Sequence, residues 1–219
     1  THEELAAWYG PGGRDIRLQG VNSGITWVIS GRRVRFMHIS GPSTGTTPPT
    51  VSIDGAPSTS LSESWNTTAL AVAQFTAWID LASGGEHTVK LSPGAAGQFI
   101  TVCGIEVSQV ESDSSEYGIQ MWDFTRSSTD AQDWLSTDNS RVTYQTACMT
   151  AIAPDIIIAS GLGSNNYAGQ TVTPSYMTTL VNNLITTYST GAQWLFVSQH
   201  QRALASPAPD KTYGPMSQE

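Results

Sequence analysis

A succession of short segments rich in β-forming residues fills the chain from Asp15 to about Val110, and this feature constrains the fold most. Gly, Pro, Ser and Asp separate the segments, and no helical periodicity lies between them. Such spacing predicts an antiparallel β-sandwich over residues 15–110, with a turn at Asp54-Gly55. The expected strands are Asp15–Leu18, Thr26–Ser30, Val34–Ile39, Thr50–Ile53, Phe75–Leu81, Glu86–Leu91 and Phe99–Val107.

The pattern changes after the polar stretch Ser112–Glu116. Strands then alternate with helices, which predicts part of a three-layer α/β domain with a parallel sheet over residues 115–219. A helix at Glu3–Trp8, within residues 1–14, is expected to belong to that domain. The expected strands are Gly118–Phe124, Pro154–Ala159, of the kind buried on both faces, and Gln193–Ser198; the expected helices are Thr129–Leu135, Ser140–Ala151 and Thr173–Ser189.

The helix expected at Thr173–Ser189 has the clearest signature. Thr173 suits its N-cap and Pro174 its first turn. Its apolar residues recur at i, i+3 and i+4, which predicts one face packed on the parallel sheet. That face includes Tyr176, Leu180, Leu184 and Tyr188.

Composition excludes several classes of function. Hydrophobic residues make up 39% of the chain, too many for a disordered protein. Ten basic and eighteen acidic residues give a net charge of −8, which argues against a nucleic-acid partner. The longest strongly apolar run, Ile156–Ala159, is far shorter than the roughly 20 residues of a membrane span. A surface rich in Ser and Thr and poor in Lys favours a virion or extracellular location.

The two cysteines and four histidines do not have the spacing of a metal site, and we expect no cofactor. Cys103 and Cys148 are interpreted either as two buried thiols or as one long-range disulfide. The histidines are His2, His38, His87 and His200.

A buried strand at Pro154–Ala159 leads directly into a glycine-rich loop, Gly163-Ser164-Asn165-Asn166. Ligands of parallel sheets bind at this edge, and an asparagine there can stabilise an oxyanion. The loop resembles the Gly-x-Asn-Asp block of SGNH (GDSL-type) hydrolases, with Asn166 in place of the Asp. The resemblance implies that Asn165 and Gly163 contribute to an oxyanion hole. A turn with solvated asparagines is the alternative.

Other parts of the SGNH pattern are weaker or absent. The glycine of the family's second block falls on Ser127 or Ser128, so Ser128 is a weaker candidate, as are Asn166 and His200. The Gly-Asp-Ser and Asp-x-x-His blocks are missing, and a serine needs a base to act as a nucleophile. Either truncation of the sequence at both ends or degeneration of the two blocks explains their absence. Whether the protein is an enzyme therefore stays open. Ser43 lies in a Gly-x-Ser-x-Gly sequence, but Pro48-Pro49 prevents the helix that a nucleophile elbow needs.

The β-rich region resembles jelly-roll modules that occur beside or inside SGNH hydrolases and often bind carbohydrate. Trp27, Trp65 and Trp78 are interpreted either as sugar-stacking surfaces or as core residues. The segments that carry the resemblance are Ile29–Phe36, Val51–Gly55, Gly84–Leu91 and Ile100–Val107.

The combination of the two regions resembles minor tail proteins of actinobacterial phages. It implies a tail-tip protein with an esterase or deacetylase domain directed at cell-surface glycan or lipid. The alternatives are an inactive structural or receptor-binding virion protein and a secreted bacterial carbohydrate esterase. The expected partners are cell-surface carbohydrate or an acyl-ester substrate, and other virion proteins; homo-oligomerisation stays open.

Overall fold

The computed structural model divides the chain into two compact units. The first comprises Thr1–Arg126 and Thr137–Ile152, and the second comprises Ser127–Ser136 and Ala153–Glu219. The structure describes residues 10–11, 15–20, 22–40, 47–63, 65, 72–110, 120–124, 134–135, 141–160, 174–188 and 191–197. The sequence-based boundaries 1–14, 15–110 and 115–219 stay a prediction.

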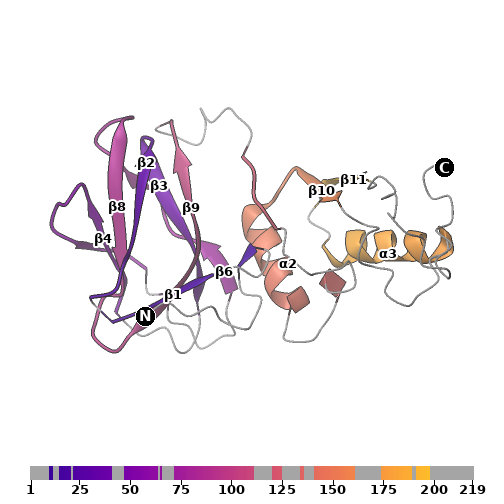
Figure 1. Ribbon diagram of the computed structural model, residues 1–219, viewed down its shortest axis with the longest axis horizontal. Helices are drawn as coiled ribbons and strands as arrows, with labels where there is room; N and C mark the ends of the chain where they lie inside the picture. The colour runs from indigo at the N-terminus through magenta and orange to yellow at the C-terminus, as the bar shows by residue number, and fades with distance from the viewer. Residues whose placement is uncertain are drawn as a thin grey trace, which may run out of the picture. The chain divides into compact units, whose positions relative to one another are not determined.

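Two antiparallel sheets form the β-sandwich of the first unit (Figure 1). The sheet that we call the β3 sheet has the order β1 (Ile16–Gln19), β9 (Phe99–Ser108), β3 (Arg33–Ser40), β6 (Val72–Phe75), and β7 (Ile79–Asp80) also pairs with β3. The second, the β8 sheet, has the order β2 (Ile25–Ser30), β8 (Glu86–Ser92), β4 (Thr50–Ile53), β5 (Thr59–Ser60). This connectivity is that of a jelly roll. The predicted antiparallel sandwich is therefore confirmed.

The sandwich core follows from the alternation of side chains along the strands. Val34 and Phe36 of β3 are fully buried, and so are Val89 and Leu91 of β8. They belong to one apolar cluster with Leu18, Ile100 and Val102 of the β3 sheet, Val51 of the β8 sheet, and Trp65 and Leu81 from connecting segments.

One expected strand, Phe75–Leu81, is wrong, because the structure has β6 and β7 with Thr76–Trp78 between them. Thr76 interrupts the strand by bonding to Phe36 in two ways. The Thr76 N–H donates to the Phe36 carbonyl over 2.9 Å, and the Phe36 N–H donates to Thr76 Oγ1 over 3.0 Å. The Phe36 N–H thus donates to the Thr76 side chain instead of to a main-chain carbonyl of a paired strand. The β-propensity of single residues does not predict this exchange.

The expected strand at Gly118–Phe124 is also wrong where it can be checked, since residues 120–124 are not in a strand. Trp122 and Phe124 instead pack against a second apolar cluster on the outer face of the β3 sheet. The helix α2 (Arg141–Ile152), close to the expected Ser140–Ala151, contributes to this cluster and contacts β6 (Figure 1).

A β-bulge helps to build that outer cluster. Met37 pairs with Gly104 and His38 with Val102, so Cys103 is an extra residue in β9. Because Val102 and Ile105 both belong with the sandwich core, the bulge leaves Cys103 and Gly104 together on the outer side. Cys103 then packs against the cluster that contains Cys148 of α2, and neither cysteine forms a disulfide.

The second unit contains a strand–helix–strand motif. β10 (Ile156–Ser160) and β11 (Gln193–Val197) pair in parallel, and α3 (Pro174–Thr187) lies between them in the sequence. The expected parallel pairing is present, and three residues of the expected apolar face of α3 are buried: Leu180, Leu184 and Tyr188. The Tyr188 hydroxyl donates to the Trp134 carbonyl. A complete three-layer α/β domain stays a prediction.

The expectation that Pro154–Ala159 is buried on both faces is wrong for this sheet. Ile156 and Ile158 are 59% and 61% exposed, and Leu195 of β11 is 53% exposed. Exposed and half-buried residues alternate along both strands. One face of the two-stranded sheet therefore contacts solvent. None of the helices in the described residues is long and apolar enough to cross a membrane.

Candidate functional site

The residues assigned to an SGNH-type site lie outside the described residues, so their roles stay predictions. These are Ser128, Gly163, Asn165, Asn166 and His200; Ser43 lies outside as well. The structure does describe the strand ends that precede two of them. Ser160 of β10 pairs with Val197 of β11, so the two strands end at the same edge of the sheet, shortly before Asn165 and His200 in the sequence.

The three tryptophans of the sandwich have different environments. Trp65 is 1% exposed and stacks on His38, and Trp27 packs against the core with its ring 5.7 Å from that of Phe36. Both are core residues. Trp78, in contrast, is half-buried outside the core cluster, which leaves it as the candidate for ligand contact.

Trp78 belongs to a group of five side chains that we call the Arg35 platform: Arg33, Arg35, Phe75, Trp78 and Glu106. Arg33 and Arg35 alternate along β3 with the core residues Val34 and Phe36, so they lie on the outer face. The Arg35 guanidinium carbon lies 4.2 Å from the Phe75 ring centroid and 4.4 Å from that of Trp78. Arg33 lies 4.2 Å from the same Trp78 ring. Cation–π contacts thus order the platform.

Glu106 holds Arg35 in place. The Nε of Arg35 donates to Oε2 of Glu106 over 2.7 Å, and the Glu106 side chain is only 5% exposed. Within the described residues, neither Nη amino group of Arg35 donates a hydrogen bond. The side chain of Arg35 is 29% exposed. The platform therefore presents fixed, unused donors beside two aromatic rings.

A groove of about 620 Å³ adjoins this platform and is lined by Arg35, Ala73, Gln74, Phe75, Thr143, Thr146, Ala147, Thr150 and Ala151. The three threonines have the i, i+3 and i+7 spacing that places side chains on one face of α2. Oγ1 of Thr146 is buried and has no hydrogen-bond partner in the described part of the chain. A buried hydroxyl without a partner is costly, and a bound polar ligand could supply one.

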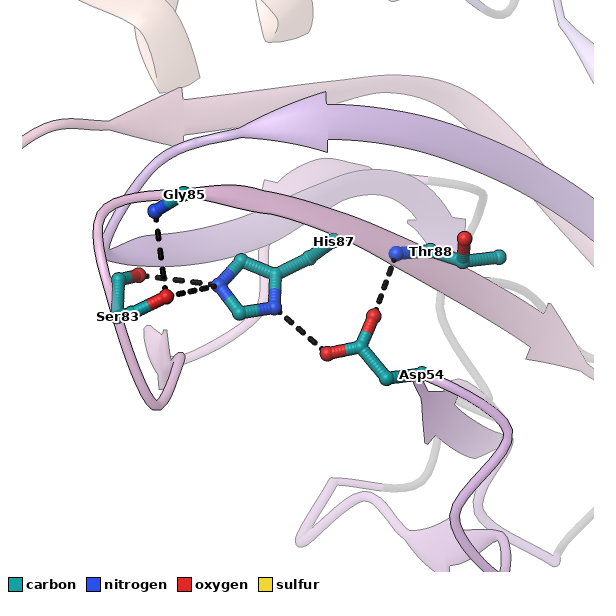
Figure 2. A network of polar contacts seen from close by, with 5 residues as sticks. All are labelled: Asp54, Ser83, Gly85, His87 and Thr88. Carbon is teal, nitrogen blue, oxygen red and sulfur yellow. Dashed lines mark hydrogen bonds and ion pairs between the residues drawn. The ribbon is translucent and has the colours of Figure 1, made fainter.

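A second polar group has the residue types of a catalytic triad. Figure 2 shows His87 between Asp54 and Ser83: Nδ1 lies 2.7 Å from Asp54 Oδ2, and Nε2 lies 3.3 Å from Ser83 Oγ. Nε2 also lies 3.0 Å from the Ser83 carbonyl, which can only accept. In this arrangement Nε2 carries a proton, and as long as it does, it cannot act as a base toward the hydroxyl.

The pKa shifts of His87 and Asp54 agree with a protonated imidazole beside an ionised carboxylate. The hydrogen bonds to Asp54 and to the Ser83 backbone raise the pKa of His87. The hydrogen bond from the His87 side chain, together with the one from the Thr88 N–H, lowers the pKa of Asp54. The expected strand Glu86–Leu91 puts His87 at a strand start, which β8 (Glu86–Ser92) confirms. The turn at Asp54-Gly55 was predicted as well, but the contact between Asp54 and His87 was not, because 33 residues separate them.

No cluster of three or more His, Cys, Asp or Glu side chains that could hold a metal ion occurs among the described residues.

No family model matches the chain, and no curated protein matches its sequence. A family 35 carbohydrate-binding module from Clostridium thermocellum is similar in structure at 13% identity and a TM-score of 0.38, over 49% of this chain and 87% of that one. A mannan-binding module is similar at 17% identity and a TM-score of 0.31, over 50% and 87%.

An exo-β-1,3-galactanase from Phanerochaete chrysosporium is similar at 16% identity and a TM-score of 0.36, over 48% of this chain and 25% of the enzyme. The chain thus spans a quarter of that enzyme's length. Such low values assign this chain neither a family nor a ligand.

Proposed function

We propose that the first unit is a glycan-binding module and that the ligand lies across the Arg35 platform and the adjoining groove. The observation that carries the proposal is the set of Nη donors of Arg35, which have no partner among the described residues and lie beside the rings of Phe75 and Trp78. Sugars combine apolar C–H faces, which suit aromatic rings, with hydroxyls that accept hydrogen bonds.

The charges favour a neutral glycan over an acidic one. Glu106 compensates the charge of Arg35, so Arg33 is the one further charge of the platform, and the whole chain carries a net charge of −8, which disfavours an acidic ligand. The lining of the groove adds hydroxyl groups from Thr143, Thr146 and Thr150 but no further charge. The ligand class that fits is therefore an uncharged oligosaccharide.

Binding is tested by isothermal titration calorimetry with neutral hexasaccharides of glucose, mannose and xylose and with a galactotriose. We expect one of these probes to bind the unmodified chain and Trp78→Ala to weaken that affinity about 10-fold or more. Phe99→Ala is the matched control, because Arg17 lies 3.6 Å from the Phe99 ring centroid in an equivalent cation–π pair that belongs neither to the Arg35 platform nor to the groove. Equal losses in both variants would refute the assignment of the site.

We propose ester hydrolysis as a second function, at the carboxyl edge of β10 and β11. The parallel pairing of Ser160 with Val197 supports it, because both strands end at that edge, and ligands of parallel sheets bind there. In this proposal Asn165 and Gly163 donate to an oxyanion, with Ser128, Asn166 and His200 as further candidates. The phage-tail or extracellular setting stays a proposal from composition and resemblance.

An acetyl-ester assay tests this second function. This chain lacks the Gly-Asp-Ser and Asp-x-x-His sequences, so we expect no serine-dependent turnover from it alone. In a polypeptide that carries this chain together with both sequences, Asn165→Ala should lower kcat about 10²–10³-fold. Serine-dependent turnover by this chain alone, or full activity of Asn165→Ala, would contradict the proposal.

A further inference from the structure

Two loops of the sandwich meet at the imidazole of His87 (Figure 2). The first is the turn after β4, where Asp54 and Gly55 both have positive φ, 52° and 74°, and the Ala56 N–H donates to the Ile53 carbonyl. Asp is one of the few residues that tolerate this backbone conformation. The turn therefore fixes the Asp54 carboxylate in front of β8, where Oδ1 accepts the Thr88 N–H over 2.8 Å.

The second loop is residues 82–85, between β7 and β8. Its ends are held by main-chain bonds: the Leu81 N–H donates to the Arg32 carbonyl, and the Gly31 N–H donates to the Gly85 carbonyl. Its middle is held by Ser83, whose carbonyl lies 3.0 Å from Nε2 of His87. The His87 side chain is 5% exposed, so the contact lies beneath the loop.

Both ring nitrogens of His87 therefore face atoms that can only accept, a carboxylate oxygen and a carbonyl oxygen. Both contacts are satisfied only when each nitrogen carries a proton, that is, when the ring is an imidazolium. A neutral ring that keeps its proton on Nδ1 would direct the Nε2 lone pair at the Ser83 carbonyl. The Ser83 hydroxyl, 3.3 Å from Nε2, is then the donor within reach.

We propose that His87 is a proton-operated latch that fastens the middle of the 82–85 loop to the Asp54–Gly55 turn and releases it as the pH rises. Loss of the Nε2 proton breaks the bond to the Ser83 carbonyl, and Nε2 then accepts from the Ser83 hydroxyl instead. The loop has to shift so that the carbonyl moves away from the lone pair.

Among the charged groups around the ring, Asp54 is the one that sets the pH at which the latch opens. Its carboxylate is the charged group in contact with the ring. Arg32 lies against the loop itself, with Nε 3.3 Å from the position that a Cβ would take on Gly84. Glu86 and Lys90 alternate with His87 along β8 and point outward, and Asp80 of β7 is exposed. The latch closes below the pKa of His87 and opens above it.

Two-dimensional NMR of the uniformly ¹⁵N-labelled chain tests the latch without any ligand. We expect His87 to titrate above the ordinary histidine pKa, and the amide resonances of Ser83 and Gly85 to shift with the same midpoint. Buried His38 should stay neutral over that range and serves as an internal control. A His87 pKa at or below the ordinary value, or loop amides that do not follow it, would overturn the proposal.

Two conservative variants test the two contacts separately. Asp54→Asn tolerates the same turn conformation but removes the charge, so it should lower the pKa of His87 and the midpoint of the loop amides together. Ser83→Ala removes the donor for the neutral ring, so it should raise the pKa of His87. If the pKa of His87 is unchanged in Ser83→Ala, Nε2 does not change its partner from the Ser83 carbonyl to the Ser83 hydroxyl. If the pKa of His87 is unchanged in Asp54→Asn, the latch proposal is overturned.

Discussion

The imidazole of His38 stacks on the indole of Trp65, with ring centroids 3.9 Å apart and an interplanar angle of 7°. Both side chains are buried inside the sandwich. The Nε2 of His38 has no hydrogen-bond partner within the described residues, and burial lowers the pKa of His38 to about 3. The core thus contains a neutral histidine that resists protonation.

This histidine should make the chain sensitive to acid. The unfolded chain binds the proton near pH 6.5, but the folded chain binds it only near 3, so stability falls as the pH falls through that window. Between pH 7 and 4.5 we expect the unmodified chain to lose about 3 kcal/mol more unfolding free energy than His38→Phe, which keeps an aromatic ring on Trp65. Urea unfolding at both pH values measures it, and equal losses would contradict it.

Thr76 should be a stability-determining residue, because its hydroxyl accepts the N–H of buried Phe36. Thr76→Val keeps the shape of the side chain but leaves that donor without a partner, which should cost about 1–3 kcal/mol. The control is Thr88→Val, at an exposed position on β8. Urea unfolding should show a change below about 0.5 kcal/mol for the control. A similar small change in Thr76→Val would mean that water replaces the hydroxyl.

Cys103 and Cys148 should react slowly with thiol reagents in the folded chain. Burial raises the pKa of Cys148 to about 12 and that of Cys103 well above its usual value, so the reactive thiolate is scarce at pH 8. We expect alkylation by iodoacetamide to be at least about 100-fold slower than in guanidinium chloride, followed by mass spectrometry. Rapid modification of the native chain would show that α2 detaches from the β3 sheet.

The buried face of α3 should stabilise the second unit. Leu180 and Leu184 are 4% and 5% exposed, so either Leu→Ala variant should lower the unfolding free energy by about 2–5 kcal/mol. Asn183→Ala, at an exposed position of the same helix, is the control. Far-ultraviolet circular dichroism in urea provides the measurement. Losses below about 0.5 kcal/mol at both leucines would contradict the burial.

Much of the fold could be predicted because local patterns determine it. The segment between Thr173 and Ser189 has a helical period over many residues, and α3 covers most of it. Asp54-Gly55 has the residues that a left-handed turn needs, and the turn is present. Strands such as Glu86–Leu91 alternate apolar and polar residues, and their predicted bounds agree with the structure to within one residue.

The candidate site could not be predicted, because its residues are brought together by pairing between distant strands. Glu106 meets Arg35 across 71 positions through the β3–β9 register, and no local motif marks that contact. The three tryptophans look alike in sequence, yet only packing in the folded chain separates Trp27 and Trp65, which lie in or against the core cluster, from Trp78. The exposed face of Ile156 and Ile158 was missed for a related reason. Apolar strands indicate burial, but the number of neighbouring strands decides it.

The measurement that tests glycan binding most directly is amide chemical-shift mapping of the ¹⁵N-labelled chain during titration with the same four neutral oligosaccharides. We predict shifts concentrated at residues 73–78 and 143–151, around the Arg35 platform and the adjoining groove, for at least one probe. The shifts should disappear in Trp78→Ala and persist in Phe99→Ala. Shifts confined to other parts of the chain, or none with any of the four probes, would contradict the account.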